Sequence, residues 1–503
     1  MSITTDEVFK KYTDNKTFEK IIKYNSISEM WKNCVKSYNS LNAIEFDGKK
    51  YTYKELEEDV ASFRSVLRNS AKSKRIALFS SNSYHFVKCY LAIVTSGLSC
   101  VILPAQLDEM SVFGCCFKFG VQTIITSPEL EEKTKIAVSR GITIINTTDT
   151  SNDKLPLVDT TPDAEAVLMF TGGTTGKSKA AVLCNKAVMQ GTINGCYGYK
   201  DVFEQKYILV LPLSHVFGLI RNLMTSLYTG SELLICKNNK DMFKDIAAFK
   251  PTILVAVPAL VEMSLNLSRQ FGKNMLGENM KYVICGAAMV PPFLIAEWAK
   301  YNITVLAGYG LTESANLVSG NPDSEKNPES VGYLYPNQEI KIVDGELWLK
   351  GENMLTEYAA EPEENKNAFE DGWFKTGDLV HLDENGYLYI VGRTKEIIVL
   401  ATGENVSPAE VESVFNKLNL VQDSQVFEDI NDNGKHILAL EVVPRASEMA
   451  KITSENKVDV LISELEKINN TLPNYERVSR IEVRNSDFER TPSMKIKRYK
   501  KCN

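Results

Sequence analysis

Short apolar stretches alternate with amphipathic, helix-like stretches between residues 75 and 306, and this alternation is the strongest constraint on the fold. Each stretch has three to five residues, rich in Ile, Val and Leu. They lie at 75–79, 99–103, 123–126, 142–145, 207–211, 232–236, 252–256, 282–285 and 304–306. Strands that alternate with helices predict an α/β fold with doubly wound sheets. Small residues follow several of the strands, which predicts a ligand crevice at the carboxyl edge of a sheet.

One connection in this region, FTGGTTGKSKA at residues 170–180, has the composition of a phosphate-binding loop. Glycine lets backbone N–H groups approach an anion, threonine adds neutral donors and lysine adds positive charge. The flanking residues 164–170 and 181–184 are apolar and strand-like. The Walker A pattern fits only the end of the loop, because Thr171 stands where the pattern needs glycine and no clear helix follows.

The chain has 503 residues, which is enough for more than one domain. Short strands punctuated by glycine predict a β-rich subdomain from about residue 330. The charged stretch 393–396 is the expected hinge. We therefore expect a large N-terminal domain at 1–393 and a small α/β domain at 394–503. The first helix of the small domain is predicted to begin with Ser407 as N-cap and Glu410 completing a capping box.

Charge, cysteines and apolar runs limit the partners and the compartment. The net charge of −7 gives no reason to expect nucleic acid or an anionic membrane as a partner. Ten cysteines without a C-x-x-C pair predict reduced thiols in a cytoplasmic protein, without structural zinc. The N-terminus lacks the pattern of a signal peptide, and no apolar run approaches the ~20 residues of a membrane span.

Five motifs occur in order along the chain: TGGTTG at 171–176 with Lys179, YGLTE at 309–313, GWFKTGD at 372–378, GR at 392–393, and TPSMK at 491–495. Together they resemble the adenylate-forming, AMP-binding superfamily, and within it the acyl-CoA synthetases. The resemblance covers nearly the whole chain, and five motifs in register are a specific signal. It implies that ATP and a carboxylic acid form an acyl-adenylate and pyrophosphate. Transfer of the acyl group to coenzyme A would then release AMP.

The resemblance also implies which residues bind the nucleotide. The phosphate loop would act through Thr171, Gly172, Gly173, Thr174, Thr175, Gly176 and Lys179. The adenine would stack on Tyr309 beside Gly286, Ala287 and Ala288, with Gly308 and Gly310 in the same site. Thr312 would bond the α-phosphate, and Glu313 would bind Mg²⁺, which prefers oxygen ligands. Asp378 would accept hydrogen bonds from both ribose hydroxyls, and Arg393 would contact ribose or phosphate.

The C-terminal region carries three further roles implied by the family. Lys495 would be the catalytic lysine that bridges the carboxylate and the α-phosphate. Lys395 matches the hinge about which the small domain turns after adenylation, and Gly403 would line the coenzyme A tunnel. The chain departs from the usual family pattern at three positions. Ser178 and Ala180 replace proline and glycine in the phosphate loop, and Met494 replaces the glycine before the lysine.

The stretch LPLSHVFG at 211–218 resembles the family segment that borders the acyl pocket. His215 would act at the acyl site, and Phe217 and Gly308 would contact the acid. No carboxylate follows Phe217 to pair an α-amino group, and burying an unpaired ammonium is costly. We therefore expect a fatty or aromatic acid rather than an α-amino acid.

Three alternatives remain open at this stage. An acyl–carrier-protein ligase would use the same adenylate but a protein-tethered phosphopantetheine thiol. A P-loop NTPase would hydrolyse ATP to ADP without an acid. A degenerate member of the family would bind nucleotide without catalysis.

Overall fold

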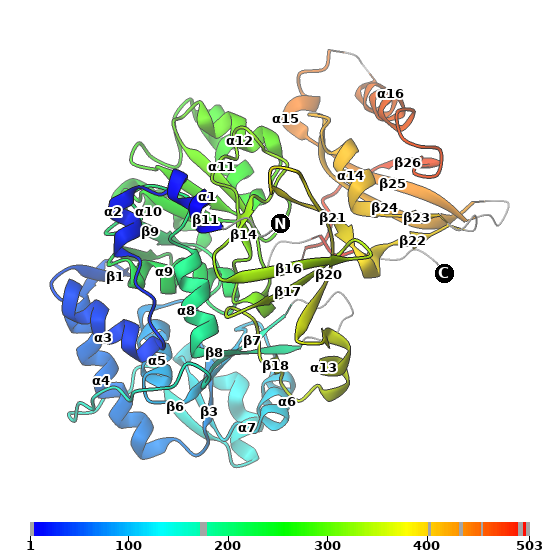
Figure 1. Cartoon of the computed structure of the whole chain (residues 1–503). Coiled ribbons are helices and arrows are strands. Elements are labelled where there is room, and N and C mark those ends of the chain that lie inside the picture. Colours follow the sequence, from blue (N-terminus) through cyan, green and yellow to red (C-terminus); the bar gives the residue numbers. More distant parts are fainter. Residues whose placement is uncertain are drawn as a thin grey trace.

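The computed structural model of the chain describes residues 5–171, 179–400, 404–431, 436–453, 456–490 and 496–498. The described chain forms two large sheets, a β-rich unit and a small C-terminal unit (Figure 1). The predicted fold class, α/β with a large N-terminal part, a β-rich subdomain and a small α/β C-terminal part, is confirmed. None of the helices in the described part combines the length and apolarity that crossing a membrane requires.

The first large sheet has seven strands in the order β18-β8-β7-β4-β3-β5-β6. Their bounds are β3 Arg75–Phe79, β4 Ser99–Leu103, β5 Thr123–Thr126, β6 Thr143–Asn146, β7 Glu165–Phe170, β8 Ala180–Cys184 and β18 Glu357–Tyr358. Strands β4, β3, β5, β6 and β7 pair in parallel, whereas β8 is antiparallel to β7 and to β18. The phosphate loop is therefore the connection between two antiparallel strands. Since a strand and not a helix follows it, the Walker A interpretation fails.

The second large sheet has nine strands in the order β15-β14-β13-β12-β11-β9-β10-β1-β2. Their bounds are β1 Asn42–Phe46, β2 Lys49–Thr52, β9 Lys206–Leu209, β10 Glu232–Ile235, β11 Ile253–Ala256, β12 Tyr282–Cys285, β13 Thr304–Tyr309, β14 Ser319–Gly320 and β15 Tyr333–Leu334. The central strands β9 to β13 and β1 pair in parallel. Strands β1 and β2 form an antiparallel hairpin, and its turn residues Asp47 and Gly48 both have positive φ.

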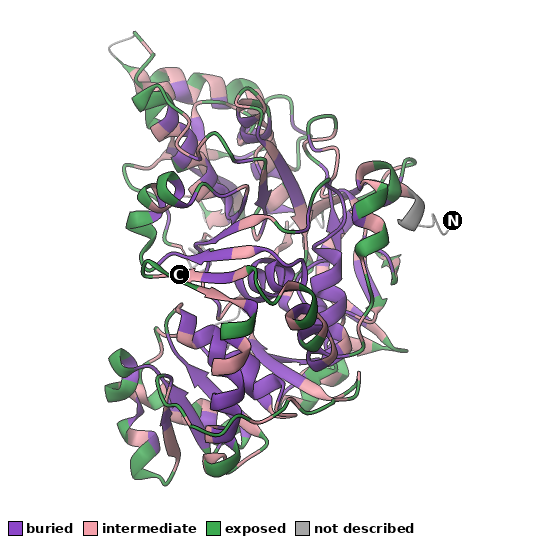
Figure 2. Cartoon of the chain, turned by 90° about the vertical axis from the view of Figure 1, so that its left-hand side faces the viewer, coloured by how far each residue is buried: buried purple, intermediate pink, exposed green. Residues whose placement is uncertain are grey.

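Helices cover both faces of these sheets, and one core joins the two sheets. Helices α4 (Tyr53–Ser70), α5 (Tyr84–Val94) and α8 (Asn185–Asn194) contribute to a single buried cluster that contains strand residues of both sheets. A second cluster under α6 (Glu109–Phe119) covers the other face of the seven-stranded sheet. Buried residues fill the sheets and the exposed residues lie on the outer helices (Figure 2). The remaining helices of this region are α1 Thr5–Tyr12, α2 Asn15–Lys20, α3 Ile27–Tyr38, η1 Pro128–Thr134, α7 Lys135–Ser139, η2 Phe217–Met224, α9 Thr225–Tyr228, η3 Asn239–Asp241, α10 Met242–Phe249, α11 Pro258–Phe271, α12 Pro292–Ala299 and η4 Thr312–Ser314.

The β-rich unit is a five-stranded antiparallel sheet in which β20 pairs with β17, β19 and β21. Its elements are β16 Gln338–Val343, β17 Glu346–Gly351, α13 Pro362–Ala368, β19 Phe369–Glu370, β20 Trp373–Leu382 and β21 Leu388–Arg393. In the register of β20 and β21, Asp378 lies opposite Arg393. This pairing brings two of the sequence motifs into contact.

The C-terminal unit follows the short helix η5 (Thr394–Glu396). It contains β22 Ile398–Val399, β23 Asn405–Val406, α14 Pro408–Phe415, β24 Val421–Ile430, β25 His436–Pro444, α15 Ala446–Met449, α16 Lys457–Asn469 and β26 Arg480–Val483. Helix α14 begins at the predicted residue, but the predicted capping box is wrong, because Ser407 makes no side-chain cap bond. Its hydroxyl donates instead to the Val391 carbonyl at 2.8 Å. The serine thus ties the start of α14 to β21.

Candidate active site

A cavity of about 380 Å³ opens at the carboxyl edge of the nine-stranded sheet. The neighbouring parallel strands β12 and β13 end there, with Cys285 opposite Ala307. Gly286, Ala287, Gly308, Tyr309 and Gly310 line the cavity, whereas Ala288 is exposed and not among the lining residues. Gly310 is required by close packing, because a Cβ at this position would overlap the Asn316 carbonyl oxygen at 1.3 Å. The crevice expected at the ends of these strands is therefore present.

Three residues of the expected nucleotide site form a hydrogen-bonded chain. The Tyr309 hydroxyl donates to one carboxylate oxygen of Asp378 at 2.5 Å, and Arg393 Nε lies 2.7 Å from the other. Asp378 is buried and does not line the cavity itself, whereas both of its partners do. Burial and the Asp378 charge raise the pKa of the Tyr309 hydroxyl well above its usual value. A carboxylate has about four acceptor sites, so Asp378 can accept further hydrogen bonds.

The pairing of β18 with β8 places a second group of charged residues together. Tyr358, opposite Ala181 in this register, donates its hydroxyl to Glu313 Oε1 at 2.8 Å. Lys179, one residue before β8, has its Nζ 5.1 Å from the centre of the Tyr358 ring and forms an ion pair with Glu364 of α13. Burial raises the pKa of the Glu313 carboxyl, although the Tyr358 hydrogen bond opposes this shift. No salt bridge to Glu313 is found among the described residues.

The phosphate loop itself is described only at its two ends. The Thr171 backbone N–H donates to the Lys179 carbonyl at 2.8 Å, which closes the base of the loop. Thr171, Lys179 and Thr312 line the cavity. Gly172, Gly173, Thr174, Thr175 and Gly176 lie outside the described residues, as do Gly403 and Lys495.

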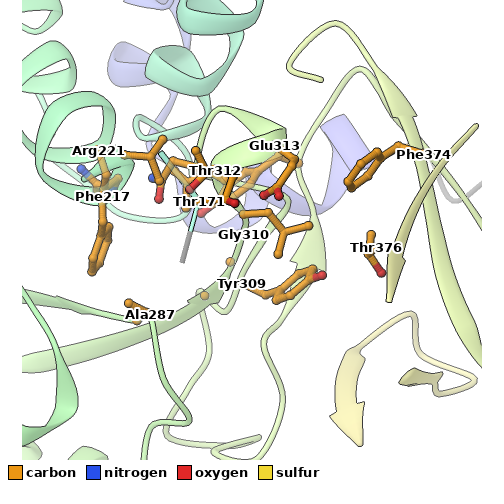
Figure 3. Close-up of a pocket in the computed structure, with 18 of the residues that line it drawn as sticks. Thr171, Phe217, Arg221, Ala287, Tyr309, Gly310, Thr312, Glu313, Phe374 and Thr376 are labelled. Atoms are coloured by element: carbon orange, nitrogen blue, oxygen red, sulfur yellow. The ribbon is translucent and has the colours of Figure 1, made fainter. Parts of the chain in front are cut away.

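The predicted acyl residues line the cavity on the side of η2. The backbone N–H of Phe217 donates to His215 Nδ1 at 3.3 Å. The Phe217 ring packs against Gly286, where an added Cβ would lie 3.5 Å from the ring. In Figure 3, Phe217 and Arg221 lie on one side of the cavity, Phe374 and Thr376 lie on the other, and Tyr309 lies between them. We refer to the side of Phe217 and Arg221 as the acyl side and to the side of Phe374 and Thr376 as the nucleotide side, after the roles expected of their sequence segments.

The expected hinge lies at the edge of the same cavity. Arg393, Thr394 and Lys395 line it, and the Lys395 side chain is exposed. The adjacent Glu396 pairs with Arg498 Nε at 3.0 Å, and Arg498 also binds Glu412 of α14 through two nitrogens at 2.7 and 2.6 Å. Arg498 thus connects the basic C-terminal tail to the hinge and to α14.

Sequence reasoning missed several residues that line this cavity, among them Tyr358 and Arg221. Tyr358 reaches Glu313 only because β18, which has two residues, adds to a sheet whose other strands lie before residue 185. A two-residue strand is too short to show a periodic sequence pattern, so this pairing could not be predicted. Arg221 carried a detectable signal, because a cation stands in the mostly apolar segment at 216–224.

Comparison with known proteins identifies the family. The model of the family described as AMP-binding enzyme matches residues 31–359, well over half of the chain. The chain belongs to the AMP-binding enzyme family. The model of the AMP-binding enzyme C-terminal domain matches residues 395–502. The resemblance inferred from the five motifs is therefore confirmed, and this AMP-binding enzyme falls in the acyl-CoA synthetase branch.

Relatives of this AMP-binding enzyme match most of its length. An oxalate–CoA ligase from Arabidopsis thaliana is 26% identical over 427 residues, which are 78% of this chain and 83% of that protein. A long-chain-fatty-acid–CoA ligase from Salmonella typhimurium is 27% identical over 467 residues, covering 80% and 82%. The prediction of an AMP-forming acid–thiol ligase is thus confirmed at the level of the family, and these names leave the acid open.

A solved structure shows the same fold. The o-succinylbenzoate coenzyme A synthetase of Bacillus subtilis, in complex with ATP and a magnesium ion, superposes with a TM-score of 0.78. The match covers 93% of this chain and 98% of that chain at 22% sequence identity. Agreement at this identity establishes the shared fold.

Proposed function

We propose that this AMP-binding enzyme activates a fatty or aromatic carboxylic acid with ATP and transfers the acyl group to coenzyme A. One observation supports this assignment best. A single cavity is lined by Tyr309, Thr312 and Arg393, which belong to nucleotide motifs, and by the aromatic residues Phe217 and Tyr199. An acid bound beside Phe217 therefore lies in the same cavity as an ATP bound beside Tyr309.

In the first step, a carboxylate oxygen of the acid attacks the α-phosphorus of ATP, the bond to the β-phosphate bridging oxygen breaks, and pyrophosphate leaves. Negative charge spreads over the phosphoryl oxygens, so donors and cations carry the catalysis. We assign Thr171, Lys179 and the loop between them to the β- and γ-phosphates, and Thr312 to the α-phosphate. We assign Lys495 to the transferring centre, by its position in the motif. In the second step, the sulfur of coenzyme A attacks the acyl carbon and AMP leaves.

Glu313 fits the ligand role for Mg²⁺. Its carboxylate is held in the cavity wall by Tyr358, and among the described residues no salt bridge satisfies its charge. Burial raises its pKa, which a divalent cation beside it would reverse. Bound there, Mg²⁺ would neutralise charge on the phosphates.

We propose that residues 394–503 turn as a unit about Lys395 between the two steps, and that Gly403 borders the path of coenzyme A. Residue 395 follows the last β-strand of the β-rich sheet, and its side chain is exposed at the cavity edge. We also propose a cytoplasmic location, because ten cysteines without a C-x-x-C pair are typical of reduced thiols.

The test is a panel of fatty and aromatic acids incubated with ATP and Mg²⁺, with and without coenzyme A. We expect release of AMP and pyrophosphate that depends on the acid, and an acyl-CoA product when coenzyme A is present. Release of ADP without an acid would refute the proposal. Thioester formation with a carrier protein but not with coenzyme A would reassign the acceptor to the phosphopantetheine thiol of an acyl carrier protein.

A second experiment separates the two steps. Lys495→Ala should abolish ATP–pyrophosphate exchange and largely spare thioester formation from a synthetic acyl-adenylate. Unchanged exchange would remove Lys495 from the mechanism.

A further inference from the structure

The acyl side of the cavity contains a buried cation that the proposed reaction does not use. Arg221 lies on η2, one turn after Phe217, and lines the cavity although only 2% of its surface is exposed. Its Nη2 donates to the Tyr199 hydroxyl at 2.8 Å, and the guanidinium lies 5.6 Å from the centre of the same ring. Its Nη1 is buried and has no hydrogen-bond partner in the described part of the chain.

No carboxylate among the described residues forms a salt bridge with Arg221. The titratable groups that act most strongly on it are Tyr199, Tyr207 and Tyr335. Arginine stays protonated in proteins, so Arg221 cannot relieve the imbalance by losing its proton. A buried charge without an opposite charge is unfavourable, and native structures normally pair it.

A second buried arginine shows what a structural role looks like in this fold. Arg64 of α4 is also 2% exposed. It forms an ion pair with Glu57, its Nε donates to the Leu155 carbonyl at 2.9 Å, and its Nη1 donates to Thr95 Oγ1 at 3.0 Å. The protein therefore satisfies all three nitrogens of Arg64. For Arg221, Nη2 is satisfied by Tyr199 but Nη1 is not.

Asn316 gives an independent indication of the same kind. It is 6% exposed, lines the same cavity, and its Nδ2 is buried with no hydrogen-bond partner in the described chain. Its backbone is fixed by the contact with Gly310 and has a φ of 89°. Two unsatisfied donors in one cavity indicate a ligand that brings acceptor atoms.

The surroundings of Arg221 indicate which part of the ligand it meets. On the nucleotide side, the charge of Arg393 lowers the pKa of Glu313. The titratable groups with the strongest effect on Arg221 are tyrosines. Phe9, Tyr197 and Tyr335 line the cavity on this side as well, with Phe9 and Tyr335 stacked at 5.0 Å. A ligand that reaches Arg221 therefore meets aromatic side chains of the cavity wall.

We propose that Arg221 binds a second carboxylate on the acid substrate, so that the preferred substrate is a dicarboxylic acid with an apolar or aromatic spacer. This inference rests on the proposed function, because it assumes that the other carboxylate is the one that is adenylated. Arginine suits the role, since its planar fork can bind a carboxylate with two parallel hydrogen bonds. It refines the expectation of a fatty or aromatic acid by adding a charge at the far end.

The test compares acids that differ only in the second carboxylate, hexanoate with adipate and benzoate with terephthalate. For the wild-type enzyme we expect the dicarboxylates to have the higher kcat/KM. Arg221→Met should lower kcat/KM for the dicarboxylates by about 100-fold, because the second carboxylate loses its hydrogen-bonding partner. The kcat/KM values for the monocarboxylates should stay within about threefold. Arg221→Lys, which keeps the charge and loses the fork, should retain part of the preference.

Arg64→Met is the matched control. Loss of its satisfied contacts should lower the unfolding temperature and leave the ratio of dicarboxylate to monocarboxylate activity unchanged. The unfolding temperature of ligand-free Arg221→Met should stay the same or rise, because the substitution removes an unbalanced buried charge.

Three results would overturn the inference. These are a wild-type preference for the monocarboxylates, an equal loss on all four acids in Arg221→Met, and a lower unfolding temperature with unchanged selectivity. The second would assign Arg221 to the reacting carboxylate or to ATP, and the third to packing.

Calorimetric titration of adipate and terephthalate into wild-type enzyme and Arg221→Met tests the role of Arg221 separately from the proposed function. Without any turnover, the proposed function fails, while tighter binding of the dicarboxylates by the wild type would still support the role of Arg221.

Discussion

The two sides of the cavity treat charge in opposite ways. Three charged groups on the nucleotide side have protein partners: Asp378 has Tyr309 and Arg393, Lys179 has Glu364, and Glu313 has Tyr358. On the acyl side, Arg221 keeps a buried nitrogen without a partner in the described chain. Protein contacts thus hold the side chains of the nucleotide side in place before any ligand binds. On the acyl side, a buried donor is left for the ligand to satisfy. Substitutions on the first side should affect all acids equally, and those on the second should change which acid is chosen.

The largest effect should follow from Asp378→Asn. The carboxylate holds Tyr309 and Arg393 and is assigned to the ribose, and hydrogen bonds to a charged group contribute roughly 2 kcal/mol each. Loss of two such bonds corresponds to about a 1000-fold lower kcat/KM for ATP. ATP–pyrophosphate exchange with several acids measures it. A change in the order of the activities with the different acids would contradict the expectation that this side affects all acids equally.

Glu313→Gln should separate activity from stability. With the Mg²⁺ ligand weakened, acyl-adenylate formation should fall about 100-fold, comparable to the loss of one charge-stabilising group in other enzymes. The ligand-free variant should unfold at a higher temperature than the wild type at pH 8, because burial disfavours the ionised glutamate.

The sign of this stability difference depends on pH. The pKa of Glu313 is raised in the folded protein, so the wild type loses stability as pH rises from the ordinary glutamate range through the folded pKa. The advantage of Glu313→Gln should therefore shrink between pH 8 and pH 5 in thermal unfolding. An advantage that grows towards low pH would contradict the assignment of a raised pKa.

Tyr358→Phe should have a smaller effect, about tenfold, because it removes one hydrogen bond to a carboxylate. That bond lowers the pKa of Glu313, so its loss should raise this pKa further. The acidic limb of the rate–pH profile should then move to higher pH, and the Mg²⁺ concentration for half-maximal activity should rise. A loss of rate without either change would mean that Tyr358 acts through packing alone.

The smallest effect should come from Phe217→Leu on the acyl side. The ring packs against Gly286, and a smaller side chain enlarges the cavity next to the acid. We expect the KM values of different acids to change by about threefold in opposite directions, with the KM for ATP unchanged. A change in the KM for ATP alone would place Phe217 on the nucleotide side.

The sequence predicted the elements with strong local patterns. The parallel strands and the β-rich unit were predicted because short apolar stretches and glycines mark them locally. The motifs also led to the residues around Tyr309, because the ends of adjacent parallel strands meet at one edge. They could not reveal that Asp378 is already bound by Tyr309 and Arg393, since that depends on antiparallel register between β20 and β21.

The features that were missed depend on contacts between distant segments. Tyr358 joins the site through a two-residue strand that pairs with residues about 175 positions earlier. Ser407 was expected to cap α14, but its hydroxyl donates a hydrogen bond to a carbonyl of β21 instead. The serine packs so closely that a Cβ at Gly392 would lie 2.3 Å from the Ser407 hydroxyl oxygen. Tertiary contacts therefore replaced the local hydrogen bond that the sequence favoured.

Phe9 shows how the acid preference of such an enzyme could change. This residue lies on the first helix of the chain, is fully buried, and lines the cavity through its contact with Tyr335. None of the five motifs includes it, and helix α1 precedes the residues that the AMP-binding family model matches. Exchanging one short helix would therefore reshape the acyl side without altering a catalytic residue. Evolution and protein engineering can both use this route to new substrates.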